Sequence, residues 1–102
     1  MSTSRVEVLR QLLAQDPAST FARYGLAMEH VKANQLAEAV SEFEAVIATD
    51  PQYSAAYYHG GQTLEKMSEL DRAREIYRRG LAASTDAHAR AEMQAALDIL
   101  GD

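Results

Sequence analysis

The amino-acid sequence predicts an all-α fold, a stack of antiparallel helix pairs with about six helices. The first observation behind this prediction is an internal repeat: Asp16-Pro17 recurs as Asp50-Pro51, 34 positions further along (51 minus 17). The second is that apolar residues recur at steps of three and four, with no stretch of strand alternation. Repeats of this period are typical of stacked helical units. At 102 residues, with 47% hydrophobic and 25% charged residues, the chain has the composition of one globular domain.

The same shift of 34 maps whole apolar stripes onto one another. It carries Leu9 to Phe43 and Leu13 to Ile47, and a second step carries Phe43 to Tyr77. The chain therefore contains about two and a half copies of one unit. We divide a single domain of residues 1–102 into a half repeat at 4–17, repeats at 20–53 and 54–87, and a C-terminal capping helix at 86–100.

Residue types that begin and end helices define the individual elements. Ser4 followed by Glu7 fits a capping box, and Pro17 and Pro51 prevent the preceding helices from continuing. Asn34 is suited to a left-handed cap between two antiparallel helices. The expected helices cover residues 4–14, 20–33, 36–47, 53–67, 70–81 and 86–100, with short links at 33–35 and 67–69.

Composition excludes several classes of function. The chain has no Cys, which excludes disulfides, thiol nucleophiles and thiolate zinc sites, and its 3 His lack the spacing of a helical zinc motif. A net charge of −5 argues against binding to nucleic acid or to an anionic membrane. No apolar run approaches the roughly 18 residues of a membrane span. We expect a cytoplasmic protein without a cofactor or metal.

Two units of the chain share a longer motif. The first contains Arg23-x2-Leu26-Ala27-x2-His30, then Ala39-x3-Phe43 and Pro51. The second contains Tyr57-x2-Gly60-Gly61-x2-Leu64, then Ala73-x3-Tyr77, with Thr85 in the last position. This pattern resembles the tetratricopeptide repeat, Trp-x2-Leu-Gly-x2-Tyr, Ala-x3-Phe and Pro, over about residues 6–85. Arg23, His30 and Thr85 depart from the family's residue types, but the spacing is intact.

The resemblance implies that the helix pairs form a right-handed superhelical stack. It also implies a non-catalytic scaffold that binds a peptide or helix of a partner protein in a concave groove lined by the first helix of each unit. The groove would not be the family's carboxylate clamp, because Tyr24 and Met28 stand where that clamp has Lys and Asn. By helical periodicity the groove residues are Phe21, Tyr24, Met28 and Val31 in the first unit, and Tyr58, Gln62 and Lys66 in the second. The alternative is that these side chains belong to the repeat core or lie under a neighbouring helix.

A different class of function is self-assembly, as a homodimer. The first helix carries Val8 in addition to the apolar residues that follow the repeat, so it has more apolar surface than one neighbouring helix should cover. The alternative is that this helix packs fully on residues 20–33. The residues considered for self-association are Val6, Val8, Leu9 and Leu12.

Charge is also patterned along the repeats. The segment 38–50 is acidic, and the segment 69–79 contains four arginines together with Glu69, Asp71 and Glu75. We expect these two helices to lie side by side with exposed ion pairs, and we do not interpret the arginines as a nucleic-acid surface.

Overall fold

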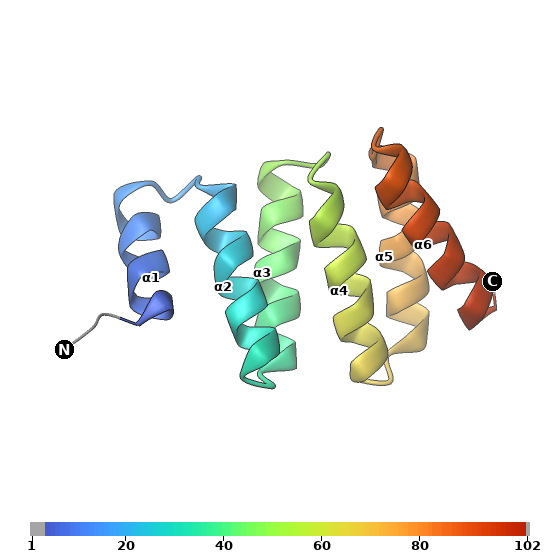
Figure 1. Ribbon diagram of the computed structural model, residues 1–102, viewed down its shortest axis with the longest axis horizontal. Coiled ribbons are helices and arrows are strands. Elements are labelled where there is room, and N and C mark those ends of the chain that lie inside the picture. The colour runs from blue at the N-terminus through green and yellow to red at the C-terminus, as the bar shows by residue number, and fades with distance from the viewer. Residues whose placement is uncertain (1–3, 102) are drawn as a thin grey trace.

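The computed structural model describes residues 4–101 and forms an elongated row of helices, 47 × 26 × 19 Å (Figure 1). Its helices are α1 (Arg5–Gln15), α2 (Thr20–Lys32), α3 (Leu36–Thr49), α4 (Ser54–Lys66), α5 (Leu70–Ala83) and α6 (Ala87–Leu100). No strand occurs within residues 4–101, so the predicted all-α repeat fold is confirmed. None of the helices in this range is both long and apolar enough to span a membrane.

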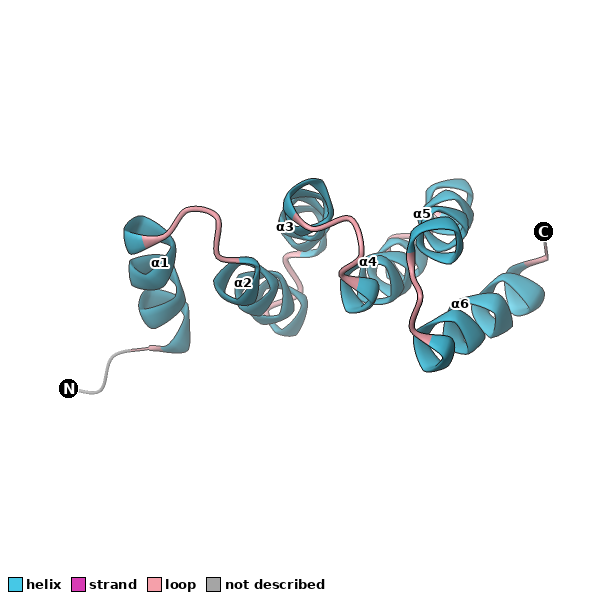
Figure 2. Cartoon of the chain, turned by 90° about the horizontal axis from the view of Figure 1, so that it is seen from above, coloured by secondary structure: helices cyan, strands magenta, loops and turns pink. Residues whose placement is uncertain are grey.

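The helices form two layers, which Figure 2 shows from above. Helices α3 and α5 lie in one layer and α2, α4 and α6 in the other, whereas α1 is inclined across both levels at one end of the row. Each helix packs against its neighbours in sequence, and α4 also contacts α6 within its own layer. Since α2 begins at Thr20 and α4 at Ser54, the two complete pairs follow the 34-residue period that the sequence shows.

The repeated Asp-Pro dipeptide has the same local structure in both copies. The carboxylate of Asp16 accepts a hydrogen bond from the Ala18 N–H, and that of Asp50 accepts one from the Gln52 N–H, both at 3.2 Å. Aspartate makes turns of this kind by bonding to the backbone two residues further on. Helices α1 and α3 both end directly before these aspartates.

The short links within each pair also repeat. Asn34 and Ser68 both have φ +60°, the left-handed conformation that closes many helices. The next N–H then bonds to the carbonyl of His30 (2.8 Å) in the first link and of Leu64 (2.9 Å) in the second. The predicted cap at Asn34 is confirmed, and Ser68 adopts the same conformation at the equivalent position.

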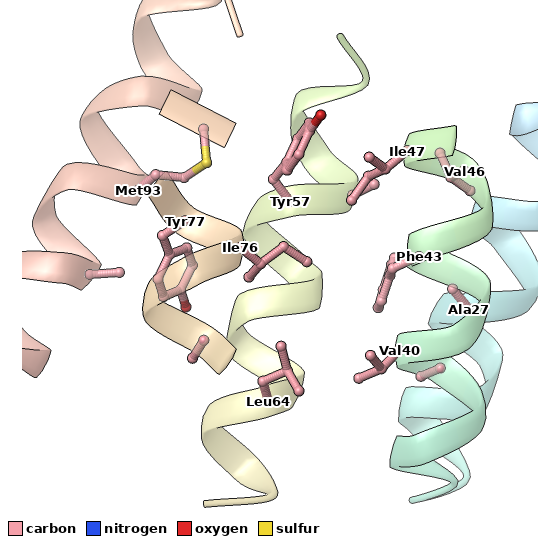
Figure 3. Packing of buried hydrophobic residues seen from close by; sticks show 14 of the residues in the cluster. Ala27, Val40, Phe43, Val46, Ile47, Tyr57, Leu64, Ile76, Tyr77 and Met93 are labelled. Atoms are coloured by element: carbon pink, nitrogen blue, oxygen red, sulfur yellow. The ribbon is translucent and has the colours of Figure 1, made fainter. Parts of the chain in front are cut away.

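Most buried side chains belong to one apolar cluster that runs from α2 to α6 (Figure 3). Phe43 and Tyr77, equivalent residues of α3 and α5, are fully buried in it. A smaller cluster joins α1 to α2, and there Leu9 is only 2% exposed because its side chain fills the space beside Gly25. Leu9 is therefore part of the core, and its inclusion among the self-association residues is wrong.

Ion pairs join neighbouring helices, and one of them links the acidic and basic segments as the charge pattern predicts. Arg79 of α5 pairs with Glu44 of α3 (3.0 Å), which confirms that these acidic and basic helices lie together. Arg23 of α2 pairs with Glu42 of α3 (3.1 Å). Each pair contributes at most about 1 kcal/mol, so the apolar cluster dominates stability.

Candidate functional site

The sequence-predicted groove residues of α2 lie on one side of the helix with different degrees of exposure. Phe21 is 67% exposed, so the alternative that it is covered by packing within the chain is wrong. Tyr24, one turn further along, is half-buried against the rings of Phe43 (5.9 Å between centroids) and Tyr53 (5.2 Å). Phe21 is thus an accessible contact, whereas Tyr24 also supports the core.

A row of aromatic rings crosses from α2 to α4. His59 lies between Tyr24 and Tyr58, with ring centroids 6.2 Å and 5.3 Å away. Burial lowers the pKa of His59, and the charge of Glu92 in α6 acts in the opposite direction. The neutral imidazole is therefore favoured, which suits a ring packed between two phenols.

We expect the His59 ring to titrate below the model-peptide value of 6.5, because burial disfavours its charged form. As the pH falls below 6.5, the unfolded chain binds this proton first, so His59 lowers the free energy of unfolding until the folded ring is also protonated. Ring-proton NMR shifts measured against pH test this expectation. A midpoint at or above 6.5 would contradict it.

A second feature is a cleft between α4 and α6, with a volume of about 400 Å³. Helix α4 contributes Tyr58, Gln62 and Glu65 to its wall. Helix α6 contributes Glu92, two alanines and Ile99, whose side chain is 85% exposed. We call this space, defined by these residues, the α4–α6 cleft.

Hydrogen bonds hold the polar side of the α4–α6 cleft in place. The buried Tyr77 hydroxyl donates to a Glu65 carboxylate oxygen, and Gln62 Nε2 donates to the Tyr77 oxygen (2.8 Å) and to Glu65 (3.3 Å). Burial, followed by the hydrogen bond to Glu65, raises the pKa of Tyr77 well above its usual range. The phenol therefore remains a donor, and Glu65 keeps its position at the cleft wall.

The structure brings only part of the predicted groove set together. Tyr58 and Gln62 line the α4–α6 cleft. Met28 and Val31 are partly buried against the main cluster, and Lys66 is exposed at the end of α4 and is not among the residues that line the cleft. Phe21 of α2 and Lys66 of α4 are thus the exposed members of the predicted set, and its other members are half-buried.

Three contributors were not among the predicted groove residues. They are His59, Glu92 and Ile99. The 34-residue repeat places His59 at the position of Gly25, which faces the preceding helix. The same shift places Glu92 at the position of Tyr58 and Ile99 at that of Glu65. Treating residues 86–100 only as a polar cap concealed the contribution of α6. Following the register through α6 would have found both side chains.

The set predicted for self-association is divided between surface and interior. Val8 and Leu12 are 42% and 38% exposed on α1, while Val6 is partly buried in the smaller cluster with the core residue Leu9. An apolar strip thus remains on α1, but it is narrower than the sequence predicts.

The chemistry of these surfaces is that of recognition. They combine aromatic rings, an exposed aliphatic side chain and the carboxylate of Glu65, which hydrogen bonds hold in place. Within residues 4–101, no three His, Cys, Asp or Glu side chains converge as a possible metal site.

Comparison with known proteins gives consistent matches. A tetratricopeptide repeat domain protein from Salinibacter ruber is 32% identical, and its crystal structure has a TM-score of 0.73, covering 80% of this chain and 94% of that chain. The solution NMR structure of that domain has a TM-score of 0.77, covering 84% and 90%. The crystal structure of MamA, 25% identical, has a TM-score of 0.77 over 94% of this chain and 57% of its own.

The sequence comparisons agree with these structures. A TPR repeat-containing protein of Pseudomonas aeruginosa is 28% identical over 90 residues, which is 87% of this chain and 86% of the relative. The family model described as tetratricopeptide repeat matches residues 30–97, more than half of the chain. Proteins of this family are generally non-catalytic interaction modules. Together with the helix pairs and their 34-residue period, these matches show that the chain belongs to the tetratricopeptide repeat family.

Proposed function

We propose that this chain is a protein-binding module that holds a peptide or helix of a partner along the face of α2, α4 and α6. One observation carries the proposal: this layer exposes large apolar side chains at both ends, Phe21 (67%) on α2 and Ile99 (85%) on α6. Between them lie the half-buried rings of Tyr24 and Tyr58. Aromatic and aliphatic anchors of this kind contribute most of the energy at protein interfaces.

The expected binding is of modest strength. Two complete helix pairs and α6 offer a short groove, which favours a contact smaller than the roughly 1,200 Å² of a stable complex. We therefore expect micromolar affinity, with specificity set by the polar groups of the α4–α6 cleft.

Affinity capture from a lysate of the source organism tests the proposal with variants that the structure predicts to fold. Phe21→Ala combined with Ile99→Ala removes both exposed anchors, and Val8→Ala combined with Leu12→Ala is the matched control on α1. The account expects a partner retained by the natural chain and by the control but lost by the first pair. Equal retention by both pairs would show that the partner binds elsewhere.

Self-assembly through α1 is a second candidate, favoured by the exposed strip of Val8 and Leu12. It predicts a dimer that these two alanine substitutions dissociate. Light scattering after gel filtration at about 100 µM distinguishes the states, because even a weak contact is then populated. A monomer under these conditions would eliminate this candidate.

A further inference from the structure

We propose that the α4–α6 cleft takes a cationic side chain, Lys or Arg, from a partner peptide that places an apolar residue beside it. This inference rests on the proposed function and specifies the chemistry of its partner. It follows from three properties of the cleft: its charge, its apolar wall and its size.

The charged groups that line the cleft are all of one sign. They are Glu65 and Glu92, and no Lys, Arg or His is among the residues that line it. Tyr77 and Gln62 donate hydrogen bonds to Glu65. Both donors are neutral, so they fix the carboxylate without cancelling its charge. Among residues 4–101, Glu92 forms its ion pair with His88, whose side chain is 87% exposed and 3.4 Å away.

Both carboxylates therefore attract a cation into a space that is partly removed from water, where an ion pair is stronger than on the open surface. The same arrangement disfavours an acidic partner, because its carboxylate would be placed beside Glu65 and Glu92. Lys66, the basic residue at the end of α4, is exposed and does not line the cleft. The chain's net charge of −5 adds long-range attraction for a basic peptide.

Apart from the two glutamates and Gln62, the cleft wall consists of Tyr58, two alanines and Ile99. Ile99 is 85% exposed, and the ring of Tyr58 is partly exposed on the opposite helix. Lys and Arg carry an aliphatic stem that packs on apolar surface while the charged head reaches a polar group. The Tyr58 ring provides a further favourable contact for a cation that lies over its face.

The size of the cleft agrees with one long side chain and a neighbour. Its volume of about 400 Å³ lies at the lower end of the range of ligand pockets, about 300–1,000 Å³. An apolar residue beside the cation would cover Ile99, which removes apolar surface from water.

The test uses short fluorescein-labelled peptides with repeated Arg-Leu pairs separated by Gly and Ser. Two matched peptides replace every Arg with Gln or with Glu. Fluorescence anisotropy with the full chain should give micromolar binding of the Arg peptide and binding at least about tenfold weaker for the other two. Raising the salt concentration should reduce the difference.

Two double variants separate the cleft from general charge attraction. Glu65→Gln with Glu92→Gln should weaken binding of the Arg peptide by about tenfold. Glu38→Gln with Glu69→Gln changes the net charge by the same amount at exposed positions that do not line the cleft, one in α3 and one in the link before α5, and it should change binding by less than about twofold. Circular dichroism confirms that both variants are helical.

Three results would overturn the inference: equal weakening by the two double variants, equal binding of the Arg and Gln peptides, or no binding of the Arg peptide at about 1 mM. The proposed function is judged separately. If a lysate partner is still lost only from the Phe21→Ala, Ile99→Ala chain, the face binds a protein and only its preference for cations is wrong. If that partner is retained, the proposed function itself fails.

Discussion

Gly61→Ala should lower the free energy of unfolding by about 2–3 kcal/mol, although alanine is the better helix former. The added methyl group would overlap the ring of Tyr77, whose atoms are the nearest to the position of that methyl group. Tyr77 is fully buried, and its hydroxyl bonds to Gln62 and Glu65, so the ring has no free direction in which to move. The cost of overpacking therefore exceeds the gain in helix propensity.

The neighbouring substitution Gly60→Ala is the matched control. Its methyl group would lie 2.9 Å from the terminal Cδ1 of Ile76, which moves by a change of rotamer. That cost is offset by a helix-propensity gain of up to about 1 kcal/mol, so stability should stay within about 1 kcal/mol of the natural chain. Urea unfolding followed by circular dichroism measures both variants. Equal losses would mean that Tyr77 is not the fixed obstacle described.

Phe43→Ala should have the largest effect on stability, a loss of about 3–5 kcal/mol. The Phe43 ring is fully buried in the main cluster (Figure 3). It contacts the ring of Tyr24 from α2, with 5.9 Å between the ring centroids. It also lies close to Gly60 of α4, so its loss leaves a cavity where three helices meet. A domain of this size has about 5–15 kcal/mol of stability, of which this is a large part.

The other phenylalanine of the chain gives the comparison. Phe21→Ala removes the same atoms from a side chain that is 67% exposed, so stability should change by no more than about 0.5 kcal/mol. Thermal and urea unfolding of the two variants should differ accordingly. A loss above about 2 kcal/mol for Phe21→Ala would show that its ring supports the core and is not an open contact.

The fold could be predicted because each unit repeats the same local signals. The Asp-Pro dipeptides, the apolar stripes and the link at Asn34 each fix local structure, and the 34-residue register makes them agree. Ser68 shows the limit of residue preference alone. Serine has no strong tendency towards φ above zero, and it adopts φ +60° because its place in the register requires the same link.

The site was predicted less completely, because helical periodicity shows which side chains share a face but not which helices meet. Tyr24 is on the predicted face, yet packing against Phe43 and Tyr53 half-buries it. The α4–α6 cleft depends on a contact between helices from different units, which places Glu92 and Ile99 opposite Tyr58. Such contacts follow from stacking and are not encoded in any one helix.

The most direct test of the central claim is the position of a captured partner on the chain, mapped by amide NMR shifts of the isotope-labelled protein. The account predicts that the largest changes lie on α2, α4 and α6, near Phe21, Tyr58 and Ile99. Changes confined to α1, or to the outer surfaces of α3 and α5, would contradict the proposed binding face.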